Sequence, residues 1–278
     1  MPNHLNIRPL EKYDLIFADA VRDSVGWNQT AADWRRLLSH EPEGCFLGEW
    51  DGVPAGVVTT IRYGNELAWI GMMLVHPDYR RRGIATALMD AAIKYLRSKK
   101  VSCIKLDATP DGAKVYECLG FRPELELHRW KGDLKSEDRA AGAQDLPLPL
   151  EFDSIAFGVD RSEWIGRLAA DGQLVRILRD DLGNPIAFGM VRKGARANYV
   201  GPISAFDEAS GRKLTILLLK NVEGLSHWDI LEENGEAIAI AQSLGFQRSR
   251  PLLRMWTGDK LISGNPALQF GIADPGTG

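Results

Sequence analysis

An internal repeat divides this chain of 278 residues into two similar halves. Three segments of the first half recur in the second half in the same order, and Phe121 and Phe246 occupy equivalent positions. The matched pairs are Pro54–Arg62 with Pro185–Arg192, Leu67–Asp78 with Ala197–Glu208, and Leu119–Asp133 with Leu244–Asp259. Three matches in one order predict a duplicated unit of about 130 residues rather than chance similarity.

The composition and the stretch between the halves agree with two domains. Hydrophobic residues make up 45% of the chain and charged residues 26%, so there is enough apolar material for two cores. Between the halves lies KSEDRAAGAQDLPLPL, whose alternating Leu and Pro residues can neither continue a helix nor pair inside a sheet. We predict a first domain over residues 1–134, a linker over 135–150, a second domain over 151–260 and a tail over 261–278. One long surface loop within a single domain is the alternative to the linker.

Hydrophobic periodicity predicts a mixed α/β first half. Apolar residues alternate or run continuously in the expected strands and recur at helical spacing in the expected helices. The strands are 5–10, 44–50, 55–63, 67–75 and 101–107, and the helices are 14–25, 31–38, 83–99 and 112–119. This order, followed by one more strand, predicts a mixed sheet with a central strand–turn–helix unit. In the tail, Leu268, Phe270 and Ile272 alternate, which fits either one short docked strand or a disordered segment.

Charge and cysteine content exclude several classes of protein. A net charge of −3 and a pI near 6.0 give no overall attraction to nucleic acid or to anionic membranes. Cys45, Cys103 and Cys118 form no close pair and no metal-binding spacing, which predicts reduced thiols in a cytoplasmic protein and no metal site. The chain starts without an apolar leader and contains no apolar run of about 18 residues, so we expect no membrane partner.

The stretch that carries chemistry is IGMMLVHPDYRRRGIATAL (Ile70–Leu88). A buried strand ends at Val75, three arginines follow a turn with proline, and Gly83 begins a long helix. Free N–H groups at a helix N-terminus, together with arginines, form a site for phosphate groups. A solvated basic turn is the alternative. The patterns of a P-loop hydrolase and of a dinucleotide-binding fold are both missing from the sequence.

The pattern R-x-x-G-x-A, filled by Arg80, Gly83 and Ala85 after the strand, resembles the acyl-CoA-binding motif of the GNAT superfamily of N-acyltransferases. The resemblance covers much of residues 5–133. It implies acetyl-CoA as the co-substrate, with its phosphates at the arginine loop and its pantetheine arm paired with main chain in a gap beside the strand. The residues implied for this binding are Met73, Leu74, Val75, Arg80, Arg81, Arg82, Gly83, Ile84, Ala85, Thr86 and Tyr116.

A second motif of the superfamily is similar to DATPDGAKVYECLGF (Asp107–Phe121). Tyr116 matches the tyrosine that commonly acts in such enzymes as the general acid near the CoA sulfur. Packing of its ring on neighbouring apolar side chains is the structural alternative. Asp107 is the best-placed carboxylate for a general base, and it can equally organise the turn that follows it. Thr109 stands where many relatives carry asparagine, and we predict that it caps the helix.

The second half lacks the arginine loop and carries Asp207 and Glu208 at the matching position. Acids there would repel a pyrophosphate, although Gly211-Arg212-Lys213 still offers a weaker anion site. We therefore interpret the second half as a degenerate GNAT-like copy that kept its fold and lost its cofactor. Such a copy can cover the active site of the first half or shape the acceptor pocket.

The acceptor has no portable motif, so a small-molecule amine and an amine of a protein both stay open. Trp27, Trp69 and Trp130 either line a pocket for a cation or pack in a core. The acids of WDILEEN either attract a cationic substrate or form a solvated loop; they are Asp229, Glu232 and Glu233.

These observations predict an N-acetyltransferase built from two tandem GNAT-like domains, each a mixed α/β fold, of which only the first binds acetyl-CoA. We expect an amine to attack the thioester directly, without a covalent enzyme intermediate. Neither Cys103 nor Cys118 has a base or cation nearby in the sequence to activate its thiol. The alternative is a non-catalytic CoA-binding sensor or interaction protein. A nucleic-acid partner would require more than the one short basic cluster at Arg80–Arg82.

Overall fold

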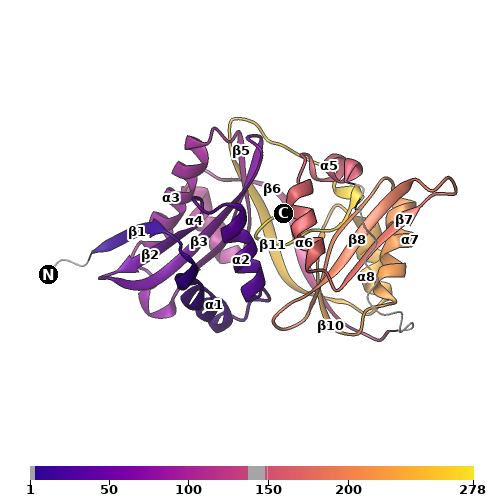
Figure 1. Ribbon diagram of the computed structural model, residues 1–278, viewed down its shortest axis with the longest axis horizontal. Coiled ribbons are helices and arrows are strands. Elements are labelled where there is room, and N and C mark those ends of the chain that lie inside the picture. The colour runs from indigo at the N-terminus through magenta and orange to yellow at the C-terminus, as the bar shows by residue number, and fades with distance from the viewer. Residues whose placement is uncertain (1–3, 137–147, 149) are drawn as a thin grey trace.

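Figure 1 shows the chain as a computed structural model, which describes residues 4–136, 148 and 150–278. The first half (indigo to magenta) and the second half (pink to yellow) lie side by side. The strands β6 (Arg122–Leu134) and β11 (Gln247–Gly258) run between them. The predicted linker lies almost entirely outside the described residues.

The first half contains every element that periodicity predicts, in the predicted order. Its elements are β1 (Leu5–Pro9), α1 (Leu15–Ser24), α2 (Ala31–His40), β2 (Phe46–Trp50), β3 (Val53–Tyr63), β4 (Leu67–Val75), α3 (Ile84–Ser98), β5 (Cys103–Ala108), α4 (Pro110–Cys118) and β6. Local chemistry fixes several boundaries. Thr30 and Asp33 form a capping box at the start of α2. Asp51 and Gly52 both adopt positive φ, as the tight turn between β2 and β3 requires.

The second half repeats this order from the helix pair onward. Its elements are α5 (Glu151–Phe157), α6 (Ser162–Ala170), β7 (Leu174–Arg179), β8 (Pro185–Lys193), β9 (Asn198–Ala205), α7 (Glu208–Leu219), β10 (Gly224–Leu231), α8 (Gly235–Ser243), β11 and β12 (Gln269–Gly271). The matched sequence segments fall on matched strands, namely β3 with β8, β4 with β9 and β6 with β11. The mixed α/β fold and its duplication are therefore as predicted.

All the strands form one sheet, because the halves exchange their last strands. The order is β1-β2-β3-β4-β5-β11-β6-β10-β9-β8-β7, with β12 paired to β9. Strand β11 of the second half pairs antiparallel with β5, and β6 of the first half pairs antiparallel with β10. The two exchanged strands are the repeated segments that end in Gly-Asp. The exchange joins the halves, because each of these strands pairs with strands of the other half.

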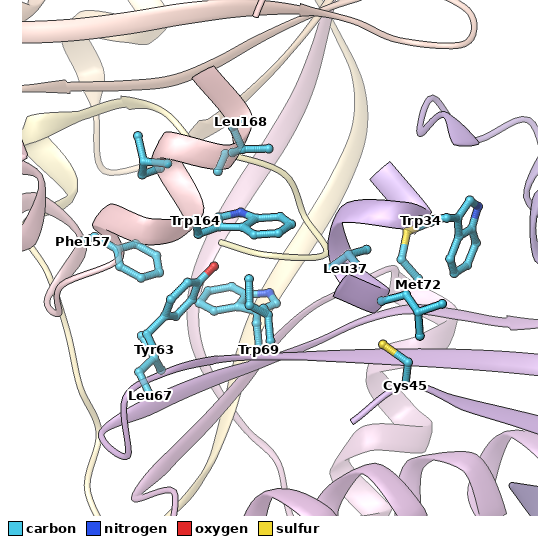
Figure 2. Packing of buried hydrophobic residues seen from close by; sticks show 14 of the residues in the cluster. Trp34, Leu37, Cys45, Tyr63, Leu67, Trp69, Met72, Phe157, Trp164 and Leu168 are labelled. Atoms are coloured by element: carbon cyan, nitrogen blue, oxygen red, sulfur yellow. The ribbon is translucent and has the colours of Figure 1, made fainter. Parts of the chain in front are cut away.

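The halves also share a hydrophobic core. In Figure 2, Phe157 and Trp164 from the second half pack against Tyr63 and Trp69 from the first half. The rings of Tyr63 and Phe157 meet edge to face with centroids 5.2 Å apart. Trp69 and Trp130 are almost fully buried in hydrophobic cores. Of the two interpretations for these residues, a pocket lining or core packing, core packing is therefore correct. The domain boundaries stay a prediction, since neither half buries its apolar residues alone.

The end of the chain is ordered against the body. Of the two alternatives for the tail, the docked strand is correct, because β12 pairs with β9. Residues 269–278, here called the C-terminal segment, continue from β12 to the boundary between the halves, where the C label lies in Figure 1. None of the helices in the described ranges has the length and apolar character needed to cross a membrane.

Candidate active site

A gap opens between β4 and β5. Their parallel pairing ends at Trp69 and Lys105, although β4 continues to Val75 and β5 to Ala108. A bulge in β4 opposite β3 accompanies the separation, and Met72 there has a φ of 50°. Within the described part of the chain, the β4 edge beyond Trp69 therefore has no strand partner on the β5 side, and this edge includes the predicted contacts Met73, Leu74 and Val75. Such an edge can pair with an extended ligand.

The arginine loop lies between the end of β4 and the start of α3. Arg80, Arg81 and Arg82 are all exposed. Gly83 begins α3 with a φ of 79°, and no side chain caps the helix. The N–H groups of the first turn, at Ile84, Ala85 and Thr86, have no partner within the helix. The loop can thus offer both backbone donors and guanidinium groups to a phosphate.

A cavity of about 100 Å³ lies at the gap. The first half contributes residues of β4, β5 and α4, and the second half contributes residues of β11 and the C-terminal segment. The lining residues are Trp27, Gln29, Ile70, Gly71, Met72, Met73, Leu106, Asp107, Thr109, Tyr116, Arg129, Arg250, Leu252, Pro275 and Gly276. Both predicted catalytic residues, Tyr116 and Asp107, therefore face one cavity together with the predicted contact Met73.

Tyr116 projects from α4 into this cavity. Its helix begins at Thr109, whose hydroxyl accepts a hydrogen bond from the Gly112 N–H at 3.3 Å, so the predicted cap is present. The Tyr116 ring also packs beside Phe121, with centroids 6.1 Å apart. Burial raises the pKa of Tyr116 to about 12, which keeps the phenol protonated at neutral pH. A protonated phenol that faces the cavity can donate a proton there.

Asp107 has a partner that the sequence did not indicate. Its carboxylate is fully buried and accepts two hydrogen bonds from Arg254 of β11, at 2.8 and 3.0 Å. Burial raises the pKa of Asp107, and the charge of Arg254 opposes that rise. The pairing exists because β11 is exchanged onto β5, where Arg254 lies opposite Asp107 in register. The second half thus orients this carboxylate.

The C-terminal segment forms one wall of the cavity. The indole N–H of Trp69 donates to the Pro275 oxygen at 3.1 Å, and the Tyr63 hydroxyl donates to the Thr277 oxygen at 2.5 Å. The Gln29 amide donates to both carboxylate oxygens of Asp274, at 3.2 and 3.0 Å. These contacts hold the turn at 274–277 against β4, so the wall is fixed by buried polar groups of the first half.

Gly71 allows this close approach, and Gly71→Ala tests it. An added methyl group would lie 2.6 Å from the Gly276 Cα atom, and the obstacle is backbone, which cannot rotate away. We expect the free energy of unfolding to fall by about 1–3 kcal/mol, measured by thermal denaturation. Gly166→Ala is the control, because nothing lies near its added methyl and an alanine favours the helix. Equal unfolding temperatures for Gly71→Ala and the unaltered protein would contradict the packing of the segment on β4.

The matching gap of the second half is occupied by the chain itself. Pairing of β9 with β10 ends at Val200 and Trp228, and β12 then pairs with β9 beyond that point. The Trp228 indole donates to the Phe270 oxygen at 2.8 Å. The Phe270 ring packs against Gly211, so this glycine lies within α7 and forms no anion-binding turn. Gly211-Arg212-Lys213 lies inside α7 and not at a helix start, so these residues are not arranged like the arginine loop of the first half.

The start of α7 is also less suited to a phosphate than the start of α3. The Asp207 carboxylate caps α7 by accepting a hydrogen bond from the Ser210 N–H at 2.7 Å. The Asp207 carboxylate thus occupies the N-terminus of α7, whereas the N-terminus of α3 is open to an anion such as a phosphate. Five residues before Phe246 the second half has Ala241, whereas the first half has Tyr116 five residues before Phe121. The second half has no counterpart of the candidate acid.

The acids of WDILEEN do not form one substrate-attracting loop. Asp229 is fully buried and paired with Arg129, with hydrogen bonds of 2.9 and 2.6 Å. Glu232 pairs with Arg248 at 2.6 Å, and Glu233 is exposed. Both interpretations are wrong for Asp229, because β10 places it inside the sheet beside β6. The sequence could not show this partner, which lies 100 residues away.

Comparisons with known proteins identify the fold and the family. Residues 12–121 match the acetyltransferase (GNAT) family, and residues 150–271 match an acetyltransferase (GNAT) domain. An acetyltransferase from Yersinia pestis is 36% identical over 101 residues, which span 35% of this chain and 71% of that protein. The chain belongs to the GNAT family. Holothin acyltransferase from Pseudoalteromonas is 23% identical over 223 residues, 77% of this chain and 73% of that protein. A putative acetyltransferase from Pyrococcus horikoshii, whose crystal structure is known, has a TM-score of 0.82 and 25% identity over 99% of this chain and 96% of that chain.

This GNAT protein is a tandem acyltransferase. Both halves match the family, and the predicted fold and enzyme class are confirmed. Among the described residues, no group of His, Cys, Asp and Glu side chains is arranged to hold a metal ion. The site is instead made of an uncapped helix start, a free strand edge and a cavity with a phenol. The strand exchange adds Arg250 of the second half to that cavity.

Proposed function

We propose that this GNAT protein transfers an acetyl group from acetyl-CoA to a primary amine. The observation that carries the proposal is the place of Tyr116, which faces a cavity where β4 and β5 separate. The free edge of β4 and the uncapped start of α3 support the binding of acetyl-CoA along one continuous path. Arg80, Arg81 and Arg82 would meet its phosphates, and the main chain of 73–75 its pantetheine arm.

The chemistry requires one bond to form and one to break. The amine nitrogen attacks the thioester carbonyl carbon, and the new C–N bond gives a tetrahedral intermediate. The C–S bond breaks when this intermediate collapses to the amide. The Tyr116 hydroxyl donates its proton to the departing sulfur, so CoA leaves as a thiol. The proton that the amine loses restores the phenol by way of Asp107 or water. Cys45 and Cys103 take no part, because both are buried and burial raises the pKa of each thiol.

Asp107 is the proposed acceptor of the amine proton. Asp107 is one of the residues that line the cavity, and burial makes its carboxylate more basic than that of an exposed aspartate. Arg254 holds the carboxylate in one orientation. This arrangement suits a base that acts on a substrate bound in a fixed position.

We further propose that only the first half binds acetyl-CoA. The second gap contains β12, and the second helix start is capped by Asp207. The second half instead supplies Arg254, Arg250 and the wall formed by the C-terminal segment. Location in the cytoplasm stays a prediction from the unpaired thiols.

The test is a turnover assay with acetyl-CoA and a panel of amines that includes amino acids, polyamines, aminoglycosides and peptides with free lysine. Release of the CoA thiol together with mass-spectrometric detection of an acetylated amine is the expected result. Asp107→Asn in the same assay tests the base. Binding of acetyl-CoA without turnover on any amine would favour the CoA-binding sensor instead.

A further inference from the structure

Among the described residues that line the cavity, one arginine forms no direct ion pair. Arg250 of β11 faces the same space as Asp107 and Tyr116. Its Nε atom is buried and has no hydrogen-bond partner. Within residues 4–136, 148 and 150–278, Arg250 forms no ion pair with any carboxylate. Arg250 as a whole is half-buried, and the carboxylates of Asp229 and Asp274 favour its charged form without forming a direct ion pair with it.

The other charged side chains of the cavity are already neutralised. Arg129 lies opposite Arg250 on the neighbouring strand and pairs with Asp229 through two hydrogen bonds. Asp107 pairs with Arg254 in the same way. Burial and the nearby charge of Arg129 lower the pKa of Arg250, yet a guanidinium stays charged near neutral pH. Among the described residues that line the cavity, Arg250 is therefore the charged side chain without a direct ion pair, and Asp229 and Asp274 offset its charge only at longer range.

A ligand can supply the missing anion. A guanidinium presents a planar fork of N–H groups that matches a carboxylate with two parallel hydrogen bonds. The free guanidinium and the proposed acid and base line one small space, so an acceptor that carries a carboxylate could present its amine between Asp107 and Tyr116.

We propose that Arg250 binds a carboxylate of the acceptor, so that the substrate class is amino acids and other amine-bearing carboxylic acids. This inference rests on the proposed function, which it narrows. Arg250 is then a specificity-determining residue contributed by the second half. It gives a reason for the strand exchange that places β11 beside the first active site.

The experiment compares matched acceptors with Arg250→Met. Each amino acid is assayed beside its carboxamide, and phosphoethanolamine beside ethanolamine. We expect Arg250→Met to lower kcat/KM for the best amino acid about 10- to 100-fold, to change that for its carboxamide less than about twofold, and to leave acetyl-CoA binding unchanged. Arg248→Met is the matched control, because Arg248 is exposed on the same strand and pairs with Glu232 outside the cavity. Thermal denaturation verifies that both variants fold.

Calorimetric binding of the same amino acids in the presence of CoA provides a readout independent of turnover. Binding that Arg250→Met abolishes, without turnover, would support the carboxylate site and overturn the transferase. If the enzyme prefers carboxamides or ethanolamine as acceptors, and Arg250→Met has the same activity as the unaltered protein, the carboxylate site is wrong. The proposed acetyltransferase activity would then still stand. Dependence on Arg250 for phosphoethanolamine alone would overturn the carboxylate class.

Discussion

Tyr116→Phe is expected to lower kcat about 10²- to 10⁴-fold, because it removes the proton that the departing sulfur takes up. The ring remains, so its packing beside Phe121 and the lining of the cavity are kept. Affinity for acetyl-CoA should therefore change little. Steady-state kinetics with a saturating amine and calorimetric titration of acetyl-CoA measure the two quantities separately.

The pH dependence sharpens this test. Because burial raises the pKa of Tyr116 to about 12, the phenol stays protonated through the physiological range, and no fall in kcat from its ionisation is expected below about pH 10. Tyr13→Phe serves as a control, since Tyr13 is 62% exposed and lies outside the cavity. If Tyr116→Phe retains kcat within a factor of about three, Tyr116 packs in the helix and is no acid.

Asp229→Ala is expected to lower the free energy of unfolding by about 3–5 kcal/mol. The substitution leaves the guanidinium of Arg129 buried without its counter-ion, and it removes the acceptor of the Tyr199 hydroxyl, which donates to Asp229 at 2.8 Å. The loss is large because the side chains of Arg129 and Tyr199 are both buried. Urea denaturation followed by tryptophan fluorescence measures it.

Two further variants separate this cause from a general effect of losing a carboxylate. Glu163→Ala breaks an exposed pair with Arg167 within α6 and should cost less than about 1 kcal/mol. The double variant Arg129→Met/Asp229→Leu removes both buried charges and should recover much of the stability lost in Asp229→Ala. If the double variant is no more stable than Asp229→Ala, then the loss of side-chain packing, and not the unpaired charge of Arg129, causes the loss of stability.

The sequence predicts the first half well because its signals are local. The alternating and helical patterns, the Asp51-Gly52 turn and the Thr109 cap each depend on neighbouring residues alone. The strand exchange is not predictable in this way. Strands β6 and β11 carry the same pattern, so the sequence of either strand fits both β5 and β10. Only the three-dimensional arrangement assigns the partners.

For the candidate site, too, the sequence predicts the residues of a local motif but not those that come from the other half. The strand end, the arginines and Tyr116 follow one another within 50 residues, and a motif can reveal them. Arg250 and residues of the C-terminal segment line the cavity from the far end of the chain, and the strand exchange brings Arg254 onto Asp107. The mistaken interpretation of Asp229 has the same origin, because its partner Arg129 comes from the other half. An acidic stretch looks solvated until the strand beside it is known.

We propose that the chain binds one acetyl-CoA, and that it binds this molecule in the first half. Calorimetric titration of acetyl-CoA into the full chain tests it directly, beside Arg81→Ala/Arg82→Ala and the matched second-half variant Arg212→Ala/Lys213→Ala. We expect one equivalent to bind, with affinity lowered about 10-fold or more in the first variant and unchanged in the second. Two equivalents bound, or affinity lost only in the second-half variant, would contradict it.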